Sequence, residues 1–260
     1  MVKVSALVNT LNEAHNIERC LRSLQWCDEV IVVDMNSEDG TGDIARGLGA
    51  QVIQTEMRPG FADPARNLGL DAATGDWIFQ LDADEELPQN CVSELLRLAN
   101  EGRYALIKLP RRNLWWGKWP RHMAWPDYQP RFFRSGSLRY GSAIHYRDVP
   151  FHRLPTYLLP AREDYAITHY VVNNLDAIVD RAVRYSIHEA DWMINQGMRY
   201  SLWRHLRALA GTIYTYTFRY PFWKDHLRGF HAFSFLLLHT HLNWVRLWER
   251  ENEKPREISD

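Results

Sequence analysis

The sequence predicts an α/β protein, with a mostly parallel sheet flanked by helices in its first hundred residues and a helical, aromatic-rich extension at its end. Short β-branched runs alternate with segments of helical periodicity in the first part, as in consecutive βαβ units. Polar and acidic residues directly follow several of these runs. Because ligands bind at the carboxyl ends of parallel strands, the same pattern predicts the edge of the sheet where a site should lie.

Periodicity predicts the elements of the first part in order. Apolar β-branched and aromatic residues form four expected strands, at residues 2–8, 29–34, 51–55 and 77–81. Asn12 stands where a helix N-cap would, because an apolar stripe with helical spacing follows it at Ile17, Cys20, Leu21 and Leu24. Further helices are expected at residues 41–48, 64–73 and 88–96.

The remainder of the chain is less regular. Strand-like segments at residues 105–109 and around 131–133 are joined by loops rich in Trp and Pro. Apolar periodicity then predicts three long helices, at residues 174–195, 202–217 and 226–251. We therefore divide the chain into three parts, residues 1–103, 104–172 and 173–260.

Composition indicates a globular protein, with 46% apolar and 24% charged residues. Charge is unevenly distributed, since residues 1–100 carry a net charge of −10 and the rest +9, with nine of the eleven tryptophans in the rest. Either these are ordinary solvated faces, or an acidic cation site precedes a basic, aromatic surface for phosphate or anionic lipid. Three cysteines without metal-ligand spacing and a start without a signal-peptide pattern predict a cytoplasmic protein.

The acids that follow the fourth expected strand are the main indication of chemistry. Asp82 and Asp84 come directly after an apolar run, and two carboxylates at a strand end can hold a hard divalent cation, Mg²⁺ or Mn²⁺. Such a cation would neutralise a diphosphate. The alternative is structural, because acids in the first turn of a helix are favoured by its dipole.

Other polar residues should converge on the same edge. Asn12 and Glu13 follow the first strand, and Asp34 ends the second, where its carboxylate could accept the ring N–H of uracil or guanine. Asp39 lies in the next loop, where structural use is at least as expected as ligand contact. Arg66 would either bind phosphate or pair with one of the acids.

Four segments in this order resemble family 2 glycosyltransferases of the Rossmann-like GT-A fold: Thr10 to Glu13, Val32 to Thr41, Ala65 to Asn67 and Leu81 to Glu85. The resemblance implies inverting transfer from a nucleotide sugar, with Glu13 and Asp34 near the nucleoside. It further implies that Asp82 lies near the ribose and the metal, and that Asp84 is a metal ligand. The stretch from Ile167 to Tyr170 resembles the place where GT-A enzymes put a histidine on the metal or diphosphate, which makes His169 a third candidate ligand.

Residues 113–119 and 126–133 resemble the subgroup that contains lipopolysaccharide-core β-1,4-glucosyltransferases. That subgroup has a Val-His-Glu segment where this chain has Ile144-His145-Tyr146, and tyrosine is a poor base near neutral pH. We therefore expect Asp148 to be the catalytic base, with Asp127 and Asp164 as alternatives.

The resemblance assigns residues 1–103 to nucleotide-sugar binding, 104–172 to the acceptor side and 173–260 to a helical extension. The expected partners are a UDP-sugar, a glycan or lipid-linked acceptor and an anionic membrane surface, without nucleic acid. We expect a peripheral enzyme on the inner face of the plasma membrane, because Arg and Trp gather in residues 219–250; helix packing is the other interpretation. Two competing functions are a nucleotidyltransferase, whose Gly-rich first loop is missing, and a glycan-binding pseudoenzyme.

Overall fold

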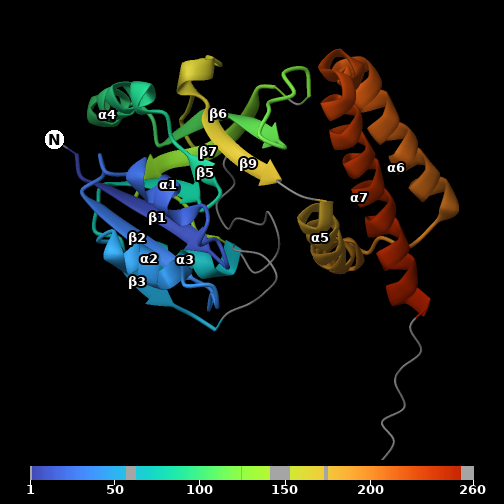
Figure 1. The fold of residues 1–260 in the computed structure, drawn as a ribbon, viewed down its shortest axis with the longest axis horizontal. Helices are drawn as coiled ribbons and strands as arrows, with labels where there is room; N and C mark the ends of the chain where they lie inside the picture. Colours follow the sequence, from blue (N-terminus) through green and yellow to red (C-terminus); the bar gives the residue numbers. More distant parts are fainter. Residues whose placement is uncertain (1, 57–62, 124, 141–152, 173–174, 253–260) are drawn as a thin grey trace, which may run out of the picture. The chain divides into compact units, whose positions relative to one another are not determined.

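The computed structural model describes residues 2–56, 63–123, 125–140, 153–172 and 175–252 (Figure 1). The chain divides into two compact units. Unit 1 comprises residues 1–119 and 125–171, and unit 2 comprises residues 120–124 and 172–260. Each unit is described by itself below.

Unit 1 is built on a nine-stranded sheet. Eight strands follow the order β3-β2-β1-β4-β7-β6-β9-β5, and the ninth, β8, pairs with β6. The strands are β1 Val4–Thr10, β2 Glu29–Asp34, β3 Gln51–Gln54, β4 Trp77–Asp82, β5 Glu85–Glu86, β6 Leu106–Trp115, β7 Asp127–Arg134, β8 Thr156–Leu158 and β9 Ile167–Val172. The first four are mutually parallel, and β7 then runs antiparallel to β4. The predicted fold class is therefore confirmed.

The parallel strands are covered on both faces, which explains their continuous apolar sequences. Val4, Ala6 and Val8 of β1 belong to one buried cluster, and Leu7 belongs to another on the opposite face. The helices of this unit are α1 Ile17–Arg22, α2 Thr41–Gly47, α3 Asp63–Ala72 and α4 Val92–Glu101, the last preceded by the 3₁₀ turn η1 Gln89–Cys91. A further 3₁₀ turn, η3, spans Glu163–Tyr165.

The predicted N-cap at Asn12 is wrong. Asn12 has a positive φ of 56°, and α1 begins only at Ile17, with Asn16 in the N-cap position. The side chain of Asn12 is used elsewhere, because its Oδ1 accepts a 2.8 Å hydrogen bond from the backbone N–H of Glu38. Asn is one of the few residues that tolerate this left-handed conformation, so the residue serves a loop and not a helix end.

Unit 2 is helical. Its helices are α5 Leu175–Asn195, α6 Leu202–Tyr214 and α7 His226–Asn252. A π-helical turn, η4 Thr215–Arg219, and a 3₁₀ turn, η5 Phe222–Asp225, connect α6 to α7. Ala190, Met193 and Leu247 form its buried core, with Trp244 packed against them. Gly229 is required where α7 meets η5, because a Cβ there would lie 1.9 Å from the carbonyl oxygen of Phe222. Among the described residues, no helix has the length and apolar character that a membrane span needs.

Candidate active site

The carboxyl ends of β1, β2 and β4 meet at one edge of the sheet. The register places Thr10 opposite Asp34 and Asn9 opposite Asp82. Strand order alone thus brings together acids that lie almost fifty residues apart in the sequence. The candidate site is built on this edge.

Asp34 is a buried carboxylate at the end of β2, with 1% of its surface exposed. Its Oδ1 accepts hydrogen bonds from the backbone N–H and the hydroxyl of Ser37, at 2.9 and 2.6 Å. Gly42 allows the carboxylate to lie this deep, because a Cβ there would come within 2.7 Å of Oδ2. The carboxylate is therefore held in one orientation before any ligand binds.

The loops after β1 and β2 are tied to each other. Asp39 Oδ2 accepts the backbone N–H of Ala14 at 2.9 Å, and Thr41 Oγ1 accepts that of Glu13 at the same distance. The carboxylate of Glu13 accepts a 2.7 Å hydrogen bond from the side chain of Asn16. Asp39 therefore acts on the conformation of these loops, which is the structural use that its sequence context allowed.

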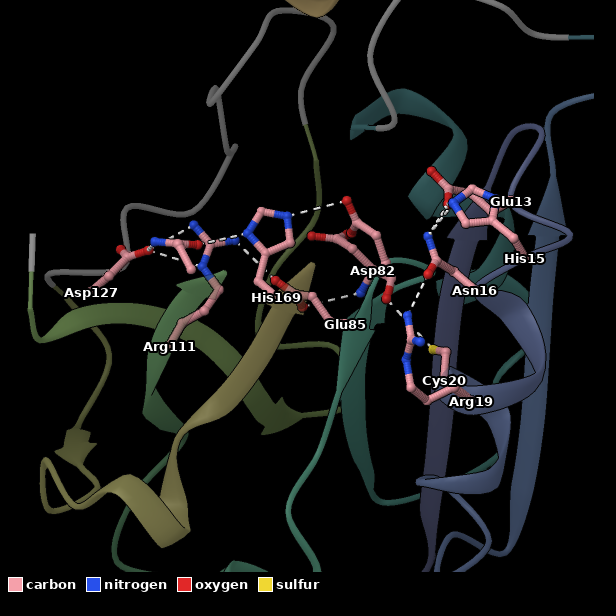
Figure 2. A network of polar contacts seen from close by, with 12 residues as sticks. Glu13, His15, Asn16, Arg19, Cys20, Asp82, Glu85, Arg111, Asp127 and His169 are labelled. Carbon is pink, nitrogen blue, oxygen red and sulfur yellow. Dashed lines mark hydrogen bonds and ion pairs between the residues drawn. The ribbon is translucent and has the colours of Figure 1, made fainter. Parts of the chain in front are cut away.

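A chain of alternating charges crosses the sheet from β4 to β7, and Figure 2 labels its members Asp82, Glu85, Arg111 and Asp127. Asp82 lies between two arginines, with Oδ1 2.5 Å from Arg66 and Oδ2 2.6 Å from Arg131. Arg131 also contacts Glu85, which in turn accepts a 2.9 Å hydrogen bond from Arg111. Of the two uses predicted for Arg66, the structure shows the ion pair.

The network continues from Arg111 to Asp127. The guanidinium of Arg111 lies 2.8 Å from Asp127 Oδ2, and the side chains of Asn113 and Gln129 donate to the same carboxylate. All four residues come from β6 and β7, whose antiparallel register places Arg111 opposite Asp127. Asp127 is therefore committed to ion pairing and hydrogen bonding.

The arginines hold these acids in their charged form. Burial alone would raise the pKa of Asp82, but Arg131 and then Arg66 outweigh burial and bring the pKa well below its ordinary value. The pKa of Asp127 is likewise lowered, because Arg111 and the hydrogen bond from Asn113 overcome the cost of burial. A carboxylate with a lowered pKa is a weaker base, which disfavours Asp127 as a proton acceptor.

Asp84, in the turn before β5, lies close to His169 of β9. His169 Nε2 lies 3.2 Å from Asp84 Oδ2, and both side chains are mostly buried. The other ring nitrogen, Nδ1, is 2.7 Å from the amide oxygen of Asn113, so Nδ1 carries the proton and donates it. Nε2 of His169 and the carboxylate of Asp84 therefore face each other across the same space.

The residues at this edge fit a divalent cation in part. A metal-binding histidine typically donates its second N–H to an oxygen, as His169 does to Asn113. Asp82, in contrast, has both oxygens engaged by arginines. Within the described ranges, no three His, Cys, Asp or Glu side chains are grouped closely enough to hold a metal by themselves. Protein ligands from Asp84 and His169 would need oxygens from a bound diphosphate to complete a coordination shell.

The predicted base cannot be placed. Asp148, together with His145 and Tyr146, lies outside the described residues. The alternative Asp164 lies on η3 and pairs with the exposed Arg162 at 2.6 Å, which lowers its pKa. The base therefore stays a prediction.

Sequence reasoning missed three charged residues of the network: Glu85, Arg111 and Arg131. Arg131 and Glu85 are almost completely buried, at 4% and 1% exposure. Both lay within the motifs that carry the resemblance, and the position of Arg131 directly before the apolar Phe132 and Phe133 of β7 was the available signal. Their pairing partners come from other strands, so the pairs could not be read from spacing.

Comparison with known proteins identifies the family. The model of glycosyl transferase family 2 matches residues 5–152. The chain belongs to this family. An uncharacterised glycosyltransferase of Rickettsia prowazekii is 30% identical over 220 residues, covering 78% of this chain and 72% of that protein. The lipopolysaccharide core biosynthesis glycosyltransferase LpsC of Rhizobium meliloti is 25% identical over 263 residues, covering 97% of this chain and 94% of its own length.

Solved structures of glycosyltransferases share the fold. S. aureus TarS in complex with UDP-GlcNAc has a TM-score of 0.51 at 14% identity, covering 98% of this chain and 93% of that one. The mannosyltransferase PcManGT from Pyrobaculum calidifontis, in complex with GDP-Man and Mn²⁺, has a TM-score of 0.52 at 16% identity, covering 98% and 76%. The family 2 chain described here therefore has the GT-A fold that its sequence predicted.

Proposed function

We propose that this family 2 enzyme transfers a sugar from a UDP-sugar to a glycan or lipid-linked acceptor, with inversion, in the synthesis of lipopolysaccharide or another surface glycan. The observation that carries the proposal is the meeting of Asp34, Asp82, Asp84 and His169 near one edge of the sheet. LpsC, which is similar over nearly the whole chain, supports the acceptor class, and TarS with its bound UDP-GlcNAc supports the donor class.

In this proposal the donor's nucleoside binds at the end of β2. Asp34 accepts the ring N–H of uracil through its buried carboxylate, whose orientation Ser37 fixes. Glu13 lies in the loop tied to the same place by Thr41. A preorganised acceptor of this kind binds its ligand without an ordering cost at the site.

Asp84 and His169 bind the metal in this proposal. Asp82 lies next to the ribose and serves as a further metal ligand. A divalent cation bound there would offset the charge of the diphosphate leaving group. Asn113 fixes the orientation of the ring by accepting a hydrogen bond from Nδ1 of His169, which leaves Nε2 facing Asp84. Mn²⁺ in the complex of PcManGT, which shares the fold, supports this choice of cofactor.

Proton removal from the acceptor hydroxyl falls to Asp148. The attack of that hydroxyl on the opposite face of the donor sugar gives an inverted product in one displacement. The described acids of the network are occupied by arginines, so they orient and balance charge instead of accepting a proton. An anionic surface at the inner face of the plasma membrane would bring the enzyme to a lipid-linked acceptor.

The metal assignment can be tested by binding and by turnover. Asp84→Asn keeps the shape of the side chain but removes its charge, so we expect UDP binding to lose its dependence on Mn²⁺ and sugar transfer to disappear. Asp71→Asn is the matched control, because Asp71 is an exposed acid paired with Arg139. Calorimetry with UDP, with and without Mn²⁺, measures the effect. Mn²⁺-dependent binding that is equal in Asp84→Asn and the parent would remove Asp84 from the metal site.

A further inference from the structure

Unit 2 exposes an apolar face along α6 and the π-helical turn η4 that follows it. Trp203 and Phe218 are 82% and 71% exposed, and four further large apolar side chains are exposed with them. We call this set the α6 face: Leu202, Trp203, Leu206, Ile213, Tyr214 and Phe218. Soluble helices bury such residues, and a contiguous exposed set marks a binding surface.

The opposite side of α6 already has its partner. His205 is buried, and its Nε2 lies 3.1 Å from Nδ1 of His241 on α7. Thr212, seven residues further along the helix, lies 3.0 Å from the hydroxyl of Thr240. Because residues seven apart lie on the same side of a helix, this side packs on α7. The α6 face is therefore not the core side of the helix.

The stretch of sequence that carries the α6 face has formal charges of one sign only. Between Asp191 and Asp225 the sequence contains no carboxylate, but it contains five basic residues, Arg199, Arg204, Arg207, Arg219 and Lys224. Arg204 and Arg207 are exposed on α6 itself. The combination of apolar and aromatic side chains with a cationic border is typical of helices that lie in the interface of an anionic bilayer.

A second copy of the chain would fit the α6 face less well than an anionic bilayer. A two-fold symmetric interface would bring the same patch of both copies together, so arginines beside the face would meet arginines. No acid within this stretch is available to compensate them. Anionic headgroups, in contrast, complement the border while the acyl region accepts Trp203, Tyr214 and Phe218.

We propose that the α6 face is the surface by which this protein docks on an anionic lipid bilayer, with its aromatic side chains at the boundary between headgroups and acyl chains. This inference rests on the membrane association included in the proposed function and assigns it to one helix. It places the expected contact on the α6 face, whose apolar side chains include the most exposed ones, Trp203 and Phe218. On α7, Trp244 stacks on His205 and Leu247 is buried, while Phe230 and Trp248 are about half exposed.

The experiment compares variants of the full chain by co-sedimentation with vesicles of phosphatidylcholine alone or mixed with phosphatidylglycerol. The test variant is Trp203→Ser/Phe218→Ser. Its matched control is Trp192→Ser/Trp248→Ser, which removes two exposed aromatic residues from α5 and α7. A charge variant, Arg204→Gln/Arg207→Gln, keeps the apolar face intact. Circular dichroism and UDP binding show whether each variant is folded.

We expect the parent and the control to bind the anionic vesicles and not the neutral ones. The test variant should partition at least about tenfold more weakly, and the charge variant should bind more weakly than the parent and with a smaller dependence on salt. Equal binding of parent, control and test variant would overturn the assignment to α6 while leaving membrane association in place. No binding of the parent would overturn both, and a parent that forms dimers broken by Trp203→Ser/Phe218→Ser would assign the face to a second copy.

Discussion

Replacing Arg131 with methionine should destabilise unit 1 more than any single surface change. Arg131 is 4% exposed and contacts Asp82 and Glu85, at 2.6 and 2.5 Å. Methionine replaces the aliphatic part of the arginine side chain but leaves the buried Glu85 and the partly buried Asp82 without that cation. Removing one partner from a buried ion pair costs about 3 to 5 kcal/mol of unfolding free energy.

The arginines that remain in Arg131→Met limit the loss of unfolding free energy. Arg111 still contacts Glu85 at 2.9 Å, and Arg66 still contacts Asp82 at 2.5 Å, so each acid keeps one cation. We therefore expect about 3 kcal/mol, the lower end of that range. With a urea dependence of about 2 kcal/mol per molar, the unfolding midpoint should fall by about 1.5 M.

Hydrogen exchange of peptides from β1 and β4, followed against urea, measures unit 1 without interference from unit 2. Arg134→Met is the matched control on the same strand, because Arg134 is exposed and donates to the carbonyls of Gly102 and Tyr104 and not to a buried acid in the hydrogen bonds of the described residues. Its cost should stay below about 1 kcal/mol. If Arg131→Met lowered the midpoint no more than Arg134→Met, the network would not hold the sheet edge together.

Three further outcomes follow from the site. Asp34→Ala should weaken UDP binding by about 1 to 3 kcal/mol in calorimetry, because it strands the ring N–H that the carboxylate would accept; unchanged affinity would place the base elsewhere. Asp148→Asn should lower transfer by about 10² to 10⁴ with normal UDP binding, whereas Asp164→Asn, a surface acid, should transfer like the parent; the reverse result would make Asp164 the base. The lowered pKa of Asp127 contributes stability that is fully present above about pH 4, near the unfolded value, and is lost as the pH falls through the folded value. The difference in urea midpoint between the parent and Asp127→Asn should therefore shrink between about pH 5 and pH 2, and a constant difference would show that the ion pair with Arg111 adds nothing.

Local pattern was sufficient for most of the fold. The strands predicted at 29–34 and 77–81 correspond to β2 and β4, and the three long helices predicted for the end of the chain correspond to α5, α6 and α7. The strands β5 and β8 were missed because they are short, and β9 was missed because its partner lies far away in the sequence, as when Glu85 pairs with His169. Asn12 was misassigned because a polar residue after a strand suits both a helix cap and a left-handed turn, and only the contact with Glu38 decides between them.

Strand topology was sufficient to predict the residues of the site that lie at the ends of parallel strands. The rule that parallel strands end together placed Asp34 and Asp82 at one edge, and the register agrees. The ion pairs of Asp82 could not be predicted, because Arg131 lies on an antiparallel strand 49 residues away. The proximity of Asp84 and His169 followed from the family resemblance and not from spacing, since 85 residues separate them.

The division of the chain makes unit 2 a poor candidate for removal. The backbone passes between the units three times, because the tip of the β6–β7 connection, residues 120–124, groups with unit 2 while both strands belong to unit 1. In that tip, the backbone N–H and ring nitrogen of His122 lie 2.8 and 3.0 Å from the carboxylate of Asp225. A protein shortened to residue 171 would keep the tip and lose Asp225. The two units are thus interleaved in sequence, and a chimera that exchanges the helical part must exchange this tip as well.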